Sequence, residues 1–258
     1  METSPILKVI TLRLSSWSVR ALLPLLHAEI PCRIDTVSLP LEHQRPGSSA
    51  EETAEDIEAL VEAGREKVEL RRRLGSVTGY FPVLHLGDIR IHEALAIAEW
   101  AAETKPSAGL WPSDPLKRAQ ARALAHEMSS GFLQLRGNLS CHFSGRVPNF
   151  KPNAATLLEI ERVFELIEGA LTVSKGPFLF GRFTITDAFY FPVLSRFATY
   201  GIPVPTSIKE YGQALLELPA LAEWRRIAQA SPSIPVYDDY IRSLGGDPEG
   251  ADWNNILG

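Results

Sequence analysis

Near the start of the chain stands the run Ile6-Leu7-Lys8-Val9-Ile10-Thr11-Leu12, which lies between Pro5 and a group of serines. Its β-branched residues and these neighbours are typical of a buried strand. An apolar segment from Ser18 to Ala28 follows with helical spacing, and Arg33-Ile34-Asp35-Thr36-Val37-Ser38-Leu39 then alternates as a second strand does. The order strand, helix, strand predicts a βαβ unit with a right-handed crossover.

A second group of strands is expected further along the chain. Phe81-Pro82-Val83-Leu84-His85-Leu86 and Ile89-Arg90-Ile91 are separated by Gly87-Asp88, which is the shortest connection of a hairpin. A helix over about residues 93–103 follows, and residues 105–109 form a linker. The pattern predicts an α/β domain with a small mixed sheet, built in the order βαβ and then ββα.

Between the two groups lies a charged segment, residues 48–73. Ser48-Ser49 and Glu51-Glu52 have the spacing of a helix-capping box. Acidic residues fill the first half and basic residues the second, which suits the helix dipole, and Gly64 predicts a break into two helices. Because charge runs are usually solvated faces, the segment is expected to be a helical insertion in contact with water.

The chain after Pro115 predicts helices alone. Apolar residues recur at helical spacing through residues 121–135 and 157–171, and Asn153 is the expected N-cap of the second stretch. Another helix is expected to begin near Thr184, and a further one to follow Pro219. This part of the chain therefore predicts an all-α helical bundle.

The two patterns divide the chain. We expect an α/β domain at residues 1–104, which includes the charged insertion, and the helical domain at residues 113–245. The tail at residues 246–258 is rich in Gly, Asp and Asn, and is expected to drape over the molecule or to fray.

Composition excludes several classes of protein. The 258 residues are 45% hydrophobic and 22% charged, which is the balance of a globular protein and not of a disordered one. The net charge is −5 without a basic stripe, so nucleic acid is not expected as a partner. No apolar run approaches the ~20 residues that span a bilayer, and the N-terminal residues lack the basic region of a secretory signal. The two cysteines, Cys32 and Cys141, stand far apart, which favours a reducing, cytoplasmic location and predicts no metal site.

Candidate chemistry lies where strands run into helices. The segment from Leu14 to Arg20 places serines at a helix start, where unpaired backbone N–H groups stabilise an anion or a thiolate. Serine is also a favoured helix cap there, and both interpretations stay open. Phe81-Pro82 opens a strand, where proline marks a sheet edge or a backbone that a ligand uses. Glu93 begins the next helix, where it binds an ammonium group or simply favours the first turn.

These motifs occur in an order that resembles a known family. The chain carries Ser-Ser-x-x-x-Arg after its first strand, then Phe81-Pro82-Val83-Leu84, then Gly-Asp-x-x-Ile-x-Glu-Ala-Leu-Ala-Ile over residues 87–97. Thr184-Ile185-Thr186-Asp187 is similar to the capping box of that family's helical domain. The ordered set resembles the cytosolic glutathione S-transferases of the serine type, and is nearest to zeta-like and to bacterial and fungal glutathione transferases. The resemblance covers roughly residues 5–230 and implies a thioredoxin-like N-terminal domain, an all-helical second domain and a homodimer.

The resemblance also assigns roles to individual residues. It implies that glutathione is the cofactor or substrate and that Ser15 activates its thiol, with Ser16 next to it. The positions that would hold the cysteinyl backbone and the γ-glutamyl end are Phe81, Pro82 as a cis-proline, Glu93 and Ala94. Ala94 stands where the family has serine, and a lost charge-assisted hydrogen bond costs ~1.5–3 kcal/mol of binding. The candidates for the glycyl end are His43, Gln44 and Arg72.

The electrophilic substrate is expected against the helical domain. Trp17 stands where zeta enzymes have cysteine, and lies next to the activating serines in sequence. Met128 and Phe132 either face this substrate or belong to the core, since both follow helical spacing. Arg136 would favour an anionic or carbonyl-bearing substrate.

Three functions remain open from the sequence. The first is a glutathione transferase, an enzyme that adds the thiolate to a small electrophilic, unsaturated molecule. The second is a glutathione-dependent cis–trans isomerase of a small unsaturated metabolite, in which the thiolate adds, a bond rotates and the thiolate leaves. The third is a non-catalytic binding module of the same fold, which the alanine at residue 94 favours. The long insertion and Ala94 indicate a specialised substrate, such as one of a biosynthetic pathway of secondary metabolism.

Overall fold

The computed structural model describes residues 4–37, 57–76 and 78–258, and its N-terminal part contains a four-stranded mixed sheet in the order β2-β1-β3-β4. The strands are β1 (Ile6–Val9), β2 (Arg33–Thr36), β3 (Val83–Leu86) and β4 (Ile89–His92). β1 pairs in parallel with β2 and antiparallel with β3, and β3 pairs antiparallel with β4. The predicted βαβ unit and the hairpin at Gly87-Asp88 are both confirmed.

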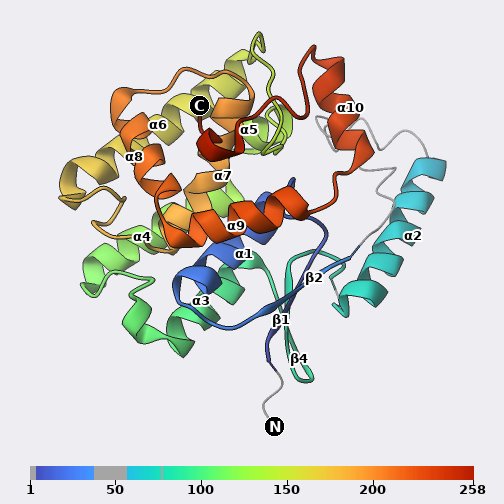
Figure 1. Cartoon of the computed structure of the whole chain (residues 1–258), viewed down its shortest axis with the longest axis horizontal. Coiled ribbons are helices and arrows are strands. Elements are labelled where there is room, and N and C mark those ends of the chain that lie inside the picture. Colours follow the sequence, from blue (N-terminus) through green and yellow to red (C-terminus); the bar gives the residue numbers. More distant parts are fainter. Residues whose placement is uncertain (1–3, 38–56, 77) are drawn as a thin grey trace.

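Three helices cover the two faces of this sheet (Figure 1). They are α1 (Ser16–His27), α2 (Ile57–Leu74) and α3 (Ala94–Thr104). Leu84 belongs to the cluster of buried residues that α1 and α3 share, whereas Val83 packs with the end of α2. Because consecutive residues of a strand point to opposite faces, α2 lies on the face opposite α1 and α3.

The prediction for the charged segment is wrong in one respect, the break at Gly64. Within its described part, one helix runs from Ile57 to Leu74 without a break at Gly64. Open space surrounds Gly64, and the ~1 kcal/mol that glycine costs inside a helix is tolerated there. One face of the helix packs on the sheet through Leu70 and Leu74, whereas Arg71, Arg72 and Arg73 are exposed, so the charged face is in contact with water as predicted. The expected capping box at Ser48–Glu52 lies outside the described residues.

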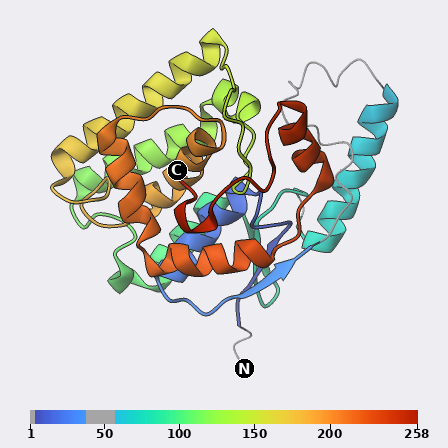
Figure 2. The ribbon, with the colours of Figure 1, turned by 45° about the horizontal axis from the view of Figure 1, so that its top comes forward.

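Helices make up the second part of the chain, as predicted (Figure 2). They are α4 (Pro115–Ser130), α5 (Leu133–Asn138), α6 (Ala154–Ser174), α7 (Ile185–Thr199), α8 (Thr206–Leu216), α9 (Pro219–Ala230) and α10 (Pro235–Ser243), with short 3-10 turns at Pro106–Ala108 and Trp253–Asn255. Nearly every residue of α7 is buried, so this helix forms the centre of the bundle. Its first turn carries the predicted capping box of Thr184 and Asp187, and Asn153 caps α6.

Two expectations for the helical part need correction. The apolar spacing through residues 121–135 continues across two helices, because Phe132 adopts φ 56° and separates α4 from α5. The tail does not fray. Ile256 is fully buried, and Asp247 forms two backbone hydrogen bonds of 2.8 Å with Arg146. The last residues therefore drape over the molecule, which was the first of the two predicted alternatives.

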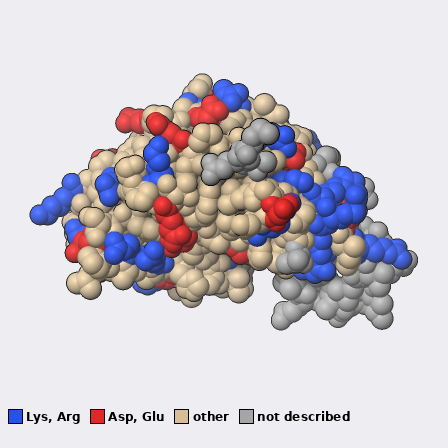
Figure 3. All heavy atoms as spheres, turned by 90° about the horizontal axis from the view of Figure 1, so that it is seen from below, with Lys and Arg blue, Asp and Glu red and all other residues tan. Residues whose placement is uncertain are grey.

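Charges are spread unevenly over the surface. In Figure 3, Lys and Arg side chains gather on the side where α2 lies in Figure 1. The exposed arginines Arg71, Arg72 and Arg73 form the last turn of α2, and Glu69 pairs with Arg72 and Arg73 at 2.7 Å and 2.6 Å. None of the described helices is both long enough and apolar enough to cross a bilayer.

Candidate functional site

The three predicted candidate segments, after β1, before β3 and after β4, lie at the same end of the sheet. Lys8 near the end of β1 is opposite Val83 at the start of β3, and Val83 is opposite His92 at the end of β4. The loop after β1, the Phe81–Pro82 peptide and the loop after β4 therefore share that end. The Phe81–Pro82 bond is cis, as the resemblance implies.

Ser15 is the N-cap of α1. Its Oγ accepts the backbone N–H of Ser18 at 3.2 Å and donates to Ser18 Oγ at 2.8 Å. The capping interpretation therefore describes this serine, and its hydroxyl hydrogen is already used within the helix. Only 8% of Ser15 is exposed.

Ser16 is bound by two arginines instead. Arg20 Nη1 on α1 donates to Ser16 Oγ at 3.3 Å, and Arg196 Nη2 on α7 donates to the same oxygen at 3.4 Å. Arg196 is itself fixed by the carbonyl oxygens of Leu139 at 2.8 Å and Pro192 at 3.2 Å. The site thus joins the first helix of the α/β part to the central helix of the bundle.

A third guanidinium completes the cluster. Arg136 donates to the carbonyl oxygens of Ser129 and Gly131 at 3.1 Å and 3.2 Å, and its Cζ lies 5.0 Å from the ring centroid of Trp17. Arg20 Cζ lies 4.7 Å from the same ring. Both contacts are within the range of cation–π attraction.

These three cations have no carboxylate partner among the described residues. Burial, followed by the charges of Arg196 and Arg136, holds the pKa of Arg20 well below its usual value. Burial and Arg196 lower the pKa of Arg136 in the same way. Arg20 Nη2 is buried and has no hydrogen-bond partner. Because buried cations are normally paired with an opposite charge, the cluster offers the positive charge and the unpartnered donor that an anion would need.

A buried thiol belongs to the same cluster. The backbone N–H of Ser16 and the side chain of Ser195 both act to lower the pKa of Cys141. Burial raises the pKa of the Cys141 thiol, against the opposing charges of Arg196 and Arg20. The thiol therefore stays neutral and leaves the positive charge of the cluster uncompensated.

The residue before α3, Glu93, has an unusual backbone conformation. Glu93 is exposed and adopts φ 77° and ψ 130° as the N-cap of α3, without a side-chain capping bond. Such a conformation is rare for a residue other than glycine, and strain of this kind clusters at functional sites. Ala94 begins α3 and is almost fully buried.

Other predicted residues lie elsewhere. Met128 is fully buried and Phe132 is 7% exposed, so the core interpretation describes both side chains. Arg72 is exposed and paired with Glu69, and His43 and Gln44 lie outside the described residues. Sequence reasoning missed Arg196 as a site residue. The sequence feature that could have indicated it is a single arginine within the apolar run of α7.

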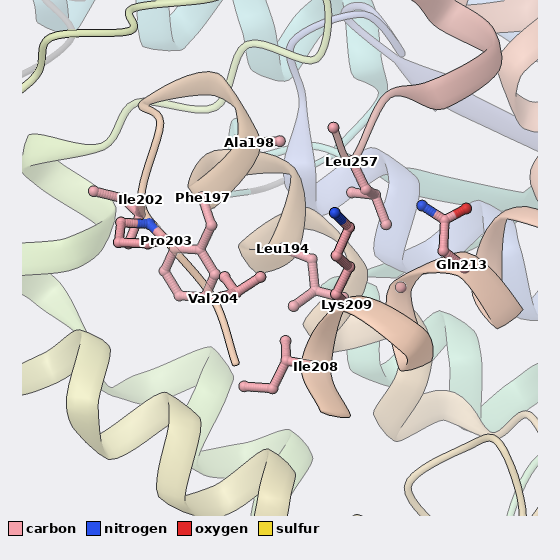
Figure 4. A pocket seen from close by; sticks show the side chains of 12 residues that line it. Leu194, Phe197, Ala198, Ile202, Pro203, Val204, Ile208, Lys209, Gln213 and Leu257 are labelled. Carbon is pink, nitrogen blue, oxygen red and sulfur yellow. The ribbon is translucent and has the colours of Figure 1, made fainter. Parts of the chain in front are cut away.

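One cavity of about 280 Å³ lies away from these residues, between α7, α8 and the end of the chain (Figure 4). Its apolar wall includes Phe197 and Val204, with Lys209 as its charged side chain. None of the predicted site residues lines it. Over the described part of the chain, no three His, Cys, Asp or Glu side chains are arranged to hold a metal ion.

Comparison with known families and curated proteins gives one family match and two relatives. The family model of the glutathione S-transferase C-terminal domain matches residues 153–226. A probable maleylacetoacetate isomerase of Caenorhabditis elegans is 32% identical over 143 residues, which cover 50% of this chain and 62% of that protein. A maleylacetoacetate isomerase of Rattus norvegicus is 33% identical, over 54% of this chain and 64% of that protein. The chain thus spans less than two thirds of the curated relatives it matches.

Solved structures match over most of the chain. A glutathione transferase homolog from Burkholderia, with bound glutathione, has a TM-score of 0.63 at 21% identity and covers 88% of this chain and 98% of that one. A Tau class glutathione S-transferase from the mango Mangifera indica has a TM-score of 0.61 at 18% identity and covers 95% and 100%. At these identities the likeness shows the fold: a thioredoxin-like domain followed by a helical domain.

Proposed function

We propose that the chain is a cytosolic glutathione transferase, an enzyme that activates glutathione; its fold and the match of residues 153–226 to the C-terminal domain of that family support this. The bound thiolate adds to a small electrophilic, unsaturated molecule. The observation that carries this proposal is the cluster in which Arg20 and Arg196 donate to Ser16 Oγ and Arg136 lies over the neighbouring Trp17, with no carboxylate partner among the described residues.

The cluster supplies what a thiolate needs. A free cysteine thiol has a pKa of ~8.5, and positive charge or a helix N-terminus lowers it. At the start of α1, Ser16, Arg20 and Arg196 surround one point with donors and positive charge. Glutathione bound there gives up its thiol proton to water near neutral pH and becomes a nucleophile.

The other groups of the tripeptide have candidate partners at the same end of the sheet. We assign the cysteinyl backbone to Phe81, beside the cis Pro82, and the γ-glutamyl ammonium to the exposed carboxylate of Glu93. The γ-glutamyl carboxylate is left with the backbone N–H of Ala94 at the start of α3. For the glycyl end, Arg72 must exchange its bond with Glu69, and His43 and Gln44 stay predictions.

The electrophile is assigned to the side of the cluster that faces the helical bundle. Trp17 and Arg136 are partly exposed there and touch each other. Arg136 would hold a carboxylate or polarise a carbonyl group of the substrate. Met128 is no longer a candidate, because its side chain is enclosed by the core.

Isomerisation is the second candidate function. The matched curated relatives are named maleylacetoacetate isomerases, and the chain shares a Ser-Ser pair with the zeta pattern. The same thiolate would add to a conjugated double bond, the bond would rotate, and the thiolate would leave, so that glutathione is regenerated. Mass spectrometry separates the two: a lasting glutathione adduct supports transfer, and an unchanged substrate mass with altered retention supports isomerisation.

A homodimer, a cytoplasmic location and a role in secondary metabolism belong to the same proposal. Sedimentation tests the dimer. Calorimetry with glutathione tests the function as a whole, because the non-catalytic alternative predicts no detectable binding at millimolar ligand. Binding with turnover of an unsaturated electrophile supports the enzyme.

A further inference from the structure

We propose that Ser16, not Ser15, donates the hydrogen bond to the glutathione thiolate, and that Arg196 with Arg20 is a positioning residue for that hydroxyl. This inference rests on the proposed function and concerns the same site. It assigns a task to a residue of the helical domain that lies 180 positions from the serine.

Ser15 has no hydrogen left to give. Its Oγ accepts the N–H of Ser18 and directs its own hydrogen to Ser18 Oγ at 2.8 Å. A thiolate bound at Ser15 would have to break this bond, and the first turn of α1 would lose part of its cap.

Ser16, in contrast to Ser15, can still donate its hydroxyl hydrogen. A hydroxyl has one hydrogen to donate and two lone pairs to accept with. Both lone pairs of Ser16 Oγ are engaged, by Arg20 Nη1 at 3.3 Å and by Arg196 Nη2 at 3.4 Å. Its hydrogen finds no acceptor in the part of the chain that the structure describes. The remaining capacity of Ser16 is therefore to donate.

The two guanidinium groups also strengthen that donor. A hydroxyl that donates to an anion gains negative charge on its oxygen, and cations bound to the oxygen stabilise this charge. Arg196 is held for this task by the carbonyl oxygens of Leu139 and Pro192. Arg20 is fully buried, and its Nη2 is a second unused donor in the same cluster.

The proton balance is simple. The glutathione S–H bond breaks and its proton passes to water, while the O–H bond of Ser16 stays intact and donates to the sulfur. The charges that face this sulfur are Arg20 on α1, Arg136 on α5 and Arg196 on α7. The nearby Cys141 thiol remains neutral.

The test measures the pKa of the bound glutathione thiol, by following thiolate absorbance in the ultraviolet against pH in the binary complex. The variants are Ser16→Ala, Arg196→Met, Arg196→Lys and Ser15→Ala. We expect Ser16→Ala and Arg196→Met to raise the thiol pKa by about one unit, a tenfold loss of thiolate at a given pH. Arg196→Lys restores part of the shift, because the charge returns without the planar geometry.

Ser15→Ala is expected to lower the melting temperature and to move the thiol pKa less than Ser16→Ala. Arg226→Met is the matched control, since it removes an exposed guanidinium that pairs with Glu223 on α9. Circular dichroism checks that each variant is folded. If Arg196→Met fails to fold, Ser16→Ala and Arg196→Lys decide.

The outcomes separate the two proposals. If the unaltered protein binds no glutathione, the proposed function fails. If it binds glutathione with a lowered thiol pKa that Ser16→Ala leaves unchanged, the proposed function stands and this inference is overturned. A larger shift for Ser15→Ala than for Ser16→Ala also overturns it.

Discussion

The guanidinium of Arg136 is held over Trp17 by two backbone carbonyl oxygens and has no carboxylate partner among the described residues. A charge-assisted hydrogen bond contributes about 1.5–3 kcal/mol. Arg136→Gln should therefore lower kcat/KM at least tenfold for an electrophile that carries a carboxylate, and much less for its methyl ester. Competition kinetics with the acid and its ester measure the difference.

Arg122→Gln is the control for that variant, because Arg122 also lies over a tryptophan, 5.4 Å from the ring centroid of Trp111, but pairs with Glu99 instead. Equal losses for the acid and its ester would show that Arg136 supports the fold and does not select the substrate.

Substitution of Ala94 by serine is expected to increase the affinity for glutathione. A serine at this first position of α3 would add a hydroxyl next to the backbone N–H that is assigned to the γ-glutamyl carboxylate. Ala94→Ser is expected to tighten the Kd for glutathione about tenfold, which corresponds to ~1.4 kcal/mol. Isothermal calorimetry measures it, with the exposed Ala96→Ser on the same helix as control. An unchanged affinity would place the carboxylate elsewhere.

Helix α7 depends on the buried carboxyl of Asp187. It accepts the N–H of Leu179 at 3.0 Å, the N–H and hydroxyl of Thr184 at 2.7 and 2.8 Å, and the hydroxyl of Tyr211 at 3.0 Å. Asp187→Ala leaves these donors without an acceptor and should cost about 2–4 kcal/mol in the free energy of unfolding. Urea denaturation measures the loss, and Asp239→Ala, which removes an exposed acid of α10, should change little. A loss below 1 kcal/mol would contradict the expectation.

Three histidines that are buried or half-buried contribute to the acid sensitivity of the whole molecule. Burial lowers the pKa of His27, His85 and His142, although Asp238 raises that of His142 in part. A folded pKa below the unfolded value of ~6.5 means that the unfolded state binds more protons. The contribution of these histidines to stability is therefore full above pH 6.5 and is lost as the pH drops below it.

Asp187 acts in the opposite direction. Burial raises its pKa to about 6, so its ionised form costs stability above that pH, and the cost is relieved as the pH falls toward ~4. His142→Gln retains a donor for Asp238 but does not titrate, and should flatten the loss of melting temperature between pH 7 and pH 5.5. An identical slope in the variant would remove His142 from this account.

Across the whole chain, local patterns predicted the order of the strands and most helices. The β-branched run at Ile6–Leu12 and the two-residue turn at Gly87-Asp88 carry their structure within a few residues. Helices α8 and α10 were missed, since both are short and follow proline-containing loops. The continuity of α2 through Gly64 was also missed, because it depends on packing at Leu70 and Leu74 far down the helix.

The candidate site was also predicted in its local features and missed in its long-range contacts. The positions of Ser15, Ser16 and Glu93 follow from strand-to-helix junctions that the sequence displays, and Phe81 precedes a predicted strand. The contact of Arg196 with Ser16 spans 180 residues, and no spacing rule reaches that far. Which of two adjacent serines keeps its hydrogen free is likewise a matter of tertiary geometry.

The hydroxyl of Thr11 and the carbonyl of Pro232 form a bond of 2.8 Å between residues 221 positions apart. A ribosome adds about 5–20 residues per second, so roughly 10–45 s separate the synthesis of these two partners. Throughout that interval the loop after β1, which carries Thr11, lacks this contact. The loop after β1, which is synthesised first, is therefore among the last parts of the protein to complete its contacts.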